Sequence, residues 1–281
     1  MFRTLILMFF TFFFFHLHAS GNLTKYINMK YAYLSYIAIF LLAILTAVQF
    51  YLYLKGANET ECGHDCGCGH DHSHEKDQPF FKRMFIYFVF LFPLCTGLFL
   101  PVATLDSNIV KSKGFSFKAI KQPEHYSQTQ YLRPDTSIYY GQDGYDELME
   151  KALKNYKGKK RIALQDEDYL KGMEAIYNAP GEFLDKTIEF SGFAFKGESI
   201  HDRQLFVLRF GIIHCIADSG VYGMLVEFPD DINIKNDQWL HVKGTLTSQF
   251  YQPFKSTIPV LQVTEWSKIK EPKDPYVYRT Y

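Results

Sequence analysis

The chain has 281 residues and carries 30 Lys and Arg against 30 Asp and Glu, so its formal net charge is zero. A general nucleic-acid-binding protein needs an excess of basic side chains to hold phosphates, so this class is excluded and no nucleic-acid partner is expected. A hydrophobic content of 47% also excludes wholesale disorder. The charges are unevenly spread: residues 1–54 contain no acid, and residues 84–105 contain no charge at all.

Three apolar segments occupy residues 4–19, 31–54 and 84–102. Residues 31–54 would form a helix of about 36 Å, which exceeds a bilayer core of roughly 30 Å. The third segment contains Pro93, which membrane helices tolerate. The first is short and ends in small residues, so a retained helix and a cleaved signal peptide both stay open. The sequence therefore predicts a multi-pass protein of the cell membrane, with the lipid bilayer as a partner.

The basic residues next to the apolar segments bear on orientation, because cytoplasmic loops carry an excess of Lys and Arg. Three crossings would place five basic residues on one side of the membrane and four on the other. This small excess favours a cytoplasmic polar loop at 55–83 and an extracytoplasmic C-terminal domain. The five are Arg3, Lys55, Lys76, Lys82 and Arg83, and the four are Lys25, Lys30, Lys111 and Lys113.

The polar loop at 55–83 holds three cysteines and four histidines within 14 residues. Thiolate and imidazole are preferred ligands of zinc and of soft late transition metals, and the glycines between them let a short backbone fold around an ion. Structural zinc motifs pair their ligands across a longer spacer, so a solvated His-rich tract without a defined site is the alternative. The candidate ligands of zinc or another transition metal are Cys62, His64, Cys66, Cys68, His70, His72 and His74.

Beyond the third apolar segment, the sequence is typical of short helices followed by strands. Helical spacing predicts helices over 143–157 and 166–180, with a short strand at 161–164 between them. Five strands in about 85 residues then suggest a small closed β-barrel of the OB kind. These strands are expected at 186–196, 204–217, 223–228, 238–248 and 258–268.

The expected fold class is an α+β membrane protein, with two to three N-terminal transmembrane helices followed by a soluble domain. That domain would combine short helices with a five-stranded OB-like β-barrel. Five consecutive segments follow from this interpretation. They are two N-terminal hydrophobic helices over 1–54, the Cys/His-rich loop over 55–83, a third transmembrane helix over 84–105, a linker and small helical region over 106–181, and the barrel domain over 182–281.

The expected strand at 204–217 ends in an unusual set of polar residues, Arg209, His214, Cys215 and Asp218. Three interpretations stay open: ordinary packing with an Arg–Asp pair, a second metal or ligand site of His214, Cys215 and Asp218, and a catalytic cysteine. Neighbours on a strand point to opposite faces, so His214 and Cys215 share a ligand only if the backbone bulges. The chain contains no nucleophile elbow, phosphate loop or HExxH motif, and no enzymatic activity is expected.

Several segments together resemble the YcgQ-like family of membrane proteins, whose members are regarded as permease subunits. The resemblance rests on the paired N-terminal helices, the His-rich loop and four short motifs. The motifs are Thr96-Gly97-Leu98-Phe99-Leu100-Pro101, Thr104-Leu105-Asp106-Ser107, Arg209-Phe210 to Ala217-Asp218, and Pro272 to Tyr278. One departure concerns His214, because members often carry two adjacent cysteines before the Ala-Asp pair. A vicinal disulfide is therefore impossible here, whereas a metal site is still compatible with the residues.

The resemblance implies a partnership with a separate polytopic permease and a link to zinc limitation. The first hypothesis is therefore an accessory subunit of a membrane transport system tied to transition-metal supply. The second is a membrane-tethered metal buffer or sensor without a permease, which leaves the C-terminal part unexplained. The third is a membrane-surface enzyme acting through Cys215, which requires an accessible thiol of lowered pKa.

Overall fold

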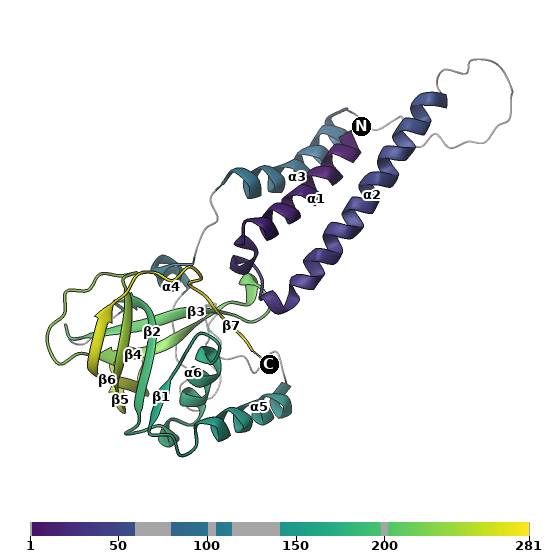
Figure 1. The fold of residues 1–281 in the computed structure, drawn as a ribbon. Coiled ribbons are helices and arrows are strands. Elements are labelled where there is room, and N and C mark those ends of the chain that lie inside the picture. The colour runs from purple at the N-terminus through teal and green to yellow at the C-terminus, as the bar shows by residue number, and fades with distance from the viewer. Residues whose placement is uncertain (1, 60–79, 101–104, 114–140, 198–201, 281) are drawn as a thin grey trace. The chain divides into compact units, whose positions relative to one another are not determined.

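The structure is a computed structural model that describes residues 2–59, 80–100, 105–113, 141–197 and 202–280 (Figure 1). The chain divides into two compact units. One comprises Met1–Thr24 and Met29–Ala103 and is called the helical unit. The other comprises Lys25–Asn28 and Thr104–Tyr281 and is called the sheet unit.

The helical unit contains the helices α1 (Phe2–Ala19), α2 (Ala32–Glu59) and α3 (Phe80–Phe99). Residues Phe2–Ala19 and Met29–Lys55 are long and apolar enough to cross a membrane, and 6% and 0% of their most apolar windows are buried. A core helix of a water-soluble protein would bury most of such a window, so these two helices have the character of membrane segments. The apolar part of α3, Met84–Phe99, is shorter.

Specific contacts join the three helices of this unit. His18 Nε2 lies 3.0 Å from the Ser35 hydroxyl, and the His18 ring lies 4.0 Å from the Tyr36 ring, centroid to centroid. Gly97 faces Phe13, because a Cβ at this glycine would lie 2.6 Å from the phenyl ring. The first helix is therefore packed against both α2 and α3.

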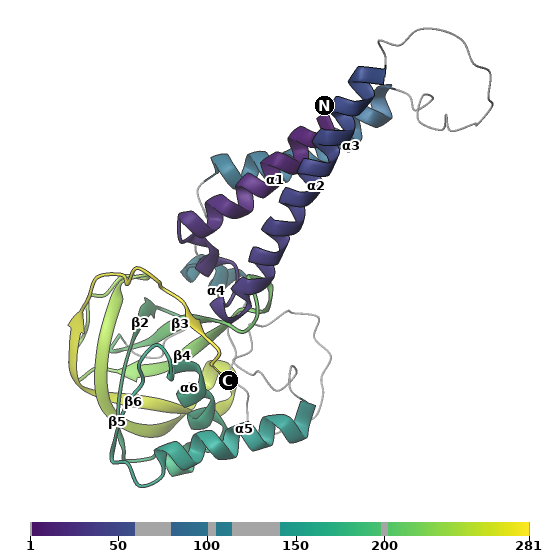
Figure 2. The same cartoon turned by 45° about the vertical axis from the view of Figure 1, so that its right-hand side comes forward.

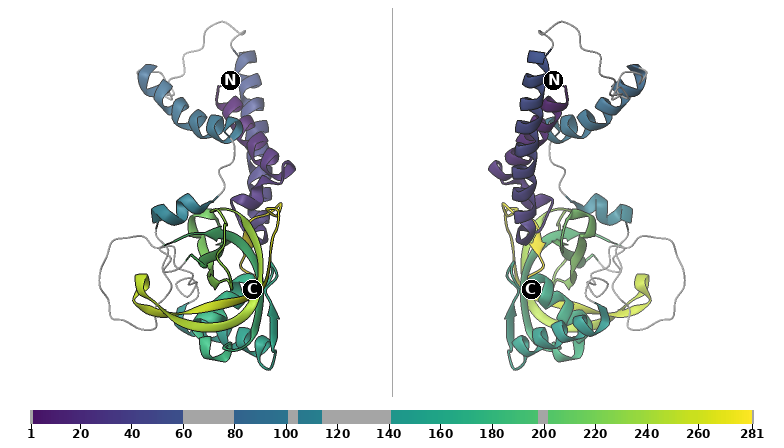
Figure 3. Two further views of the ribbon diagram at one scale, coloured as in Figure 1. Left: turned by 90° about the vertical axis from the view of Figure 1, so that its left-hand side faces the viewer. Right: turned by 90° about the vertical axis from the view of Figure 1, so that its right-hand side faces the viewer.

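The sheet unit contains a seven-stranded sheet in the order β1-β2-β5-β6-β4-β3-β7, with an additional pairing between β2 and β3. The pairings therefore connect β2, β5, β6, β4 and β3 in a closed circuit, with β1 and β7 attached outside it. The long strands β5 and β6 are strongly curved (Figure 3). The strands are β1 (Arg161–Ala163), β2 (Thr187–Phe195), β3 (Gln204–Ile212), β4 (Gly220–Glu227), β5 (Trp239–Tyr251), β6 (Ser256–Lys268) and β7 (Val277–Tyr278).

The predicted count of five strands is therefore corrected to seven. The five expected strands correspond to β2 to β6, and the two additional members of the sheet are short. The strand expected at 161–164 is β1, which pairs in parallel with β2 from Arg161↔Thr187. The two-residue strand β7 pairs in parallel with β3 and lies beyond Pro275. Two or three residues are too few for alternation to reveal a strand.

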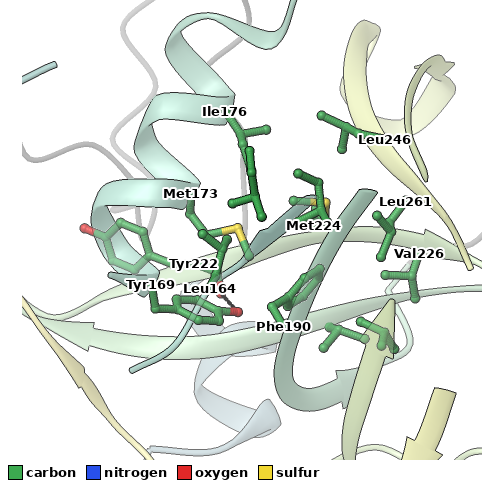
Figure 4. Close-up of a cluster of buried hydrophobic side chains, with 14 of the residues drawn as sticks. Leu164, Tyr169, Met173, Ile176, Phe190, Tyr222, Met224, Val226, Leu246 and Leu261 are labelled. Carbon is green, nitrogen blue, oxygen red and sulfur yellow. Dashed lines mark hydrogen bonds between the residues drawn. The ribbon is translucent and has the colours of Figure 1, made fainter. Parts of the chain in front are cut away.

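Three helices belong to the sheet unit: α4 (Ser107–Lys113), α5 (Gly141–Tyr156) and α6 (Tyr169–Asn178). Figure 2 shows α6 between α5 and the strands. Its residues Met173 and Ile176 are fully buried against Phe190 and Met224 in one core cluster (Figure 4). Val110 of α4 is buried in a second cluster, around Phe206 and Phe210 of β3. Apolar burial on both sides of the strands thus holds the short helices.

Candidate functional site

The predicted second site, formed by His214, Cys215 and Asp218, lies in a turn that follows a strand and not within one long strand. Strand β3 ends at Ile212, and a short 3-10 helix follows at Ile216–Asp218. The Asp218 carboxylate accepts hydrogen bonds from the backbone N–H groups of His214 and Cys215, each at 3.0 Å. It also lies 2.7 Å from His214 Nδ1. The structure therefore brings His214, Cys215 and Asp218 together through the local backbone.

This geometry does not by itself define a metal centre. Within the part of the chain that the structure describes, no group of three or more His, Cys, Asp or Glu side chains is arranged to hold a metal ion. The Asp218 oxygens already accept hydrogen bonds from the His214 N–H and the Cys215 N–H and lie beside His214 Nδ1. Cys215, which carries the thiol, is the residue that caps the 3-10 helix. A metal role for these three residues stays a prediction.

The seven candidate ligands of the Cys/His-rich loop fall within residues 60–79, outside the described residues. Their role as metal ligands therefore stays a prediction from composition. These ligands are Cys62, His64, Cys66, Cys68, His70, His72 and His74.

The buried Arg209 side chain forms its ion pair with Asp166 rather than with Asp218. Its guanidinium also donates to the Tyr276 carbonyl at 3.1 Å and lies 5.5 Å from the ring centroids of Tyr169 and Trp239. A buried charge needs such partners because desolvation is costly. Arg209 therefore connects β3 to residues 269–280, called the C-terminal segment. The expected Arg–Asp pair thus forms with a different aspartate, and Arg209 has a structural role.

A second buried ion pair was not predicted from the sequence. Glu174 of α6 is 0% exposed, and its partner Arg279 is 3% exposed. Beside them, the buried Tyr222 hydroxyl has no hydrogen-bond partner among the described atoms. Burial raises the pKa of Tyr222 well above its usual range, and the negative charge of Glu174 adds to this effect.

The connection between α1 and α2 is hydrogen-bonded into the sheet unit at the candidate site. Ile27 forms an antiparallel bridge with Cys215. The Asn28 N–H donates to the His214 carbonyl at 2.9 Å, and the Ile216 N–H donates to the Tyr26 carbonyl at 2.8 Å. These pairings attach residues 26–28 to residues 214–216, which follow the end of β3 at Ile212.

The Asn28 side chain strengthens this attachment. Its amide Nδ2 donates to the carbonyls of Ile213 and Arg279, both at 3.0 Å, and the residue is buried. One side chain thus joins the α1–α2 connection, the residue that follows β3 and the C-terminal segment. Sequence reasoning missed this residue, because the contact spans 185 positions and Asn28 belongs to no motif.

We expect Asn28→Ala to lower the free energy of unfolding of the sheet unit by about 1–3 kcal/mol, because two buried carbonyls lose their donor. Both tryptophans of the chain, Trp239 and Trp266, lie in the sheet unit, so their fluorescence during urea unfolding of the detergent-solubilised chain reports on this unit. Asn22→Ala is the matched control, since Asn22 is only partly buried and its amide donates to the nearby Ser20 hydroxyl in an exposed hydrogen bond. Equal midpoints for the two variants would contradict the role assigned to Asn28.

Together, the exposed apolar helices and the sheet unit define a membrane protein with a polar α/β domain. Residues 2–116 match the DUF1980 N-terminal domain, and residues 139–279 match the DUF1980 C-terminal domain. The chain belongs to the DUF1980 family. A relative named YcgQ that matches the whole chain confirms the resemblance to YcgQ-like proteins.

Two relatives match the chain over nearly its whole length. "UPF0703 protein YcgQ" of Bacillus subtilis (strain 168) is 68% identical over 287 aligned residues, which cover 100% of both chains. A protein of Streptococcus mutans serotype c is 36% identical over 272 residues, covering 95% of this chain and 94% of the relative. This second relative is named "Putative two-component membrane permease complex subunit".

Proposed function

We propose that the chain is an accessory subunit of a membrane permease complex and works beside a separate polytopic permease. The observation that carries this proposal is the relative named as a permease complex subunit, which aligns with 95% of the chain. The alignment is long enough to include both the helical unit and the sheet unit. If the two proteins shared only a membrane anchor, the alignment would not extend through the C-terminal domain.

The character of the helices supports the need for a partner. The apolar segments 31–54 and 84–102 contain no charged residue, whereas ion-coupled transport pathways place acidic, basic or His side chains inside the membrane. Large side chains instead point outward from the helices, such as Phe40 and Tyr51 of α2 and Phe85 of α3. Such a surface suits contact with lipid and with the helices of another membrane protein.

Affinity purification from native membranes in mild detergent tests the proposal. A polytopic membrane protein at near-stoichiometric amount, identified by mass spectrometry, is the expected result. A chain that purifies alone in several mild detergents would overturn the permease-subunit role. If the same sample carried bound metal, the alternative role as a membrane-tethered metal buffer or sensor would replace it.

We further propose three membrane crossings. Residues 25–28 belong to the sheet unit and are hydrogen-bonded to residues 214–216, so this proposal places the α1–α2 connection on the same side of the membrane as residues 105–280. Helix α2 leads away from that side, and α3 must therefore cross back despite its shorter apolar length. The contacts of α1 with Ser35 and Gly97 favour a first helix that is retained.

The basic residues then orient this topology. The end of α2 and the start of α3 carry Lys55, Lys82 and Arg83, which favours a cytoplasmic Cys/His-rich loop and an extracytoplasmic sheet unit. Cysteines introduced singly at Asn22 and Asn233 should react alike with a membrane-impermeant maleimide on intact cells. Labelling of only one of the two positions would exclude the three-crossing arrangement.

The Cys/His-rich loop is proposed to capture zinc or another transition metal. Its support is the density of thiol and imidazole groups in residues 61–74. Deleting these residues should remove most bound zinc, copper and cobalt from the purified chain, as measured by elemental analysis. Unchanged metal content would refute the loop as the binding segment and leave His214, Cys215 and Asp218 as the next candidates.

We also propose that the closed circuit of β2, β5, β6, β4 and β3 is an OB-like barrel. Its support is the topology: β2, β3 and β4 pair antiparallel in sequence, β4 pairs in parallel with β6, and β5 closes the circuit between β6 and β2. In this proposal the barrel presents a binding or docking surface, and the chain has no enzymatic activity of its own. An enzymatic turnover that is lost when Cys215 is alkylated would contradict the absence of enzymatic activity.

A further inference from the structure

A small cavity in the sheet unit has a lining that no part of the proposed function uses. Its volume is about 260 Å³, and its residues come from the N-terminal end of α4, from β2, β3 and β5, and from the C-terminal segment. Three carboxylates line it, those of Asp106, Asp237 and Glu271, and no basic side chain does. Two other described cavities are lined by lysines as well as acids, so this cavity differs from them in charge.

Two of the carboxylates are held in place by the fold. Asp237 accepts hydrogen bonds from the Ser107 N–H at 2.9 Å and from the Ser107 hydroxyl at 2.6 Å. Asp106 accepts from the N–H and side-chain amide of Asn108, at 3.1 and 3.0 Å, and from the Ile109 N–H at 3.3 Å. These donors are neutral, so the negative charges are positioned without being neutralised. The third carboxylate, that of Glu271, belongs to an exposed residue.

Aromatic rings form another part of the lining. Phe193 stacks on Phe210 with 5.4 Å between ring centroids, and Trp239 meets Phe193 edge to face at 6.2 Å. Tyr276 completes this wall, and its hydroxyl accepts a hydrogen bond from the Leu105 N–H at 2.9 Å. Aromatic faces attract organic cations, and do so most strongly where water is excluded.

The combination of carboxylates and aromatic rings in one lining favours some classes of cation over others. The described residues include no group of three His, Cys, Asp or Glu side chains able to hold one metal ion, so the three negative charges do not converge on a point. A ligand with its positive charge spread over an apolar chain suits this arrangement better than a compact hydrated metal ion. A zwitterionic lipid headgroup also fits poorly, because its phosphate would face the three carboxylates.

We propose that this cavity binds a small soluble organic cation of the alkylammonium class, such as a diamine or polyamine. The ammonium groups would pair with Glu271, Asp106 and Asp237, and the alkyl chain would lie along the rings of Phe193 and Trp239. The Arg209 guanidinium lies 5.5 Å from the Trp239 ring centroid, but Arg209 does not line the cavity and is paired with Asp166. All residues that line the cavity belong to this chain, so binding of the amine does not require the permease partner.

Isothermal titration of the full chain in detergent micelles with spermidine tests this inference, and Trp239 provides a fluorescence signal within the cavity lining. We expect saturable binding that Glu271→Gln weakens about two- to fivefold, as expected for the loss of one exposed charge. Glu167→Gln is the matched control, because it removes one exposed Glu charge outside the cavity lining. Raising the salt concentration should weaken binding to the wild-type chain.

Three results would overturn the inference. One is the absence of saturable spermidine binding to the wild-type chain. A second is an equal affinity of the Glu271→Gln and Glu167→Gln variants for spermidine. The third is binding of glycerophosphoethanolamine as tight as that of spermidine, since this would identify a lipid headgroup rather than a free amine as the ligand.

Discussion

Replacing Glu174 by Gln is expected to lower the free energy of unfolding of the sheet unit by about 3–5 kcal/mol. The substitution preserves the shape of the side chain but leaves the guanidinium of Arg279 charged in a buried position. Arg279 cannot lose its proton at any accessible pH, so the cost is not relieved by titration. Urea unfolding, monitored by tryptophan fluorescence, measures this loss of stability, and urea adds no salt that would screen the charges.

Two further variants separate this charge effect from a loss of packing. The double variant Glu174→Met with Arg279→Met should recover much of the lost stability, because both charges are then removed together. Glu147→Gln should leave the unfolding midpoint unchanged, since its partner Lys151 and Glu147 are both exposed. A loss of less than about 1 kcal/mol in the Glu174→Gln variant would mean that the pair is not buried in the folded chain.

Replacing Gly223 by Ala is expected to cost about 3 kcal/mol, the upper end of the range for overpacked positions. A Cβ at this position would lie 2.0 Å from the Val207 carbonyl oxygen and 2.8 Å from the Leu208 Cα. Both are backbone atoms of the paired strand β3, which cannot rotate away. The N–H of Gly223 also donates to the Tyr177 hydroxyl at 2.9 Å, so a displaced β4 loses its hydrogen bond to α6.

Gly181→Ala is the control for this prediction. A Cβ there meets nothing within 4 Å, and the backbone of Gly181 does not have a positive φ. Its unfolding midpoint should stay equal to that of the wild type or rise slightly, because alanine restricts the unfolded chain. Similar midpoints for Gly223→Ala and Gly181→Ala would refute the close approach of β3 and β4.

The apolar helices and the main strands could be predicted because their signals are local. The strand expected at 186–196 corresponds to β2, Thr187–Phe195, where apolar residues recur along the strand. The strand expected at 204–217 ends earlier, at Ile212, because Asp218 folds the following residues into a turn. Hydrophobic periodicity does not reveal a hydrogen bond between a carboxylate and the backbone N–H of a residue four positions earlier.

The contacts that organise the candidate site could not be predicted, because they join distant parts of the chain. Asn28 and Arg279 are 251 positions apart, and nothing in their flanking residues indicates the contact. Glu174 follows the buried Met173 on α6, and its pairing with Arg279 explains why a charged residue is tolerated in that position. The helix expected to begin with Asp166 begins instead after Asp168, and Asp166 pairs with Arg209, which is 43 positions away.

Site-specific photo-crosslinking in native membranes tests the proposed partnership most directly. A benzophenone amino acid at Phe40, which is 66% exposed on α2, should crosslink to one polytopic membrane protein, identified by mass spectrometry. The same probe at Phe250, an exposed residue of β5, controls for contacts that any surface position makes. A Phe40 probe that yields only lipid adducts, or the same set of proteins as the Phe250 probe, would contradict the role of the chain as a permease subunit.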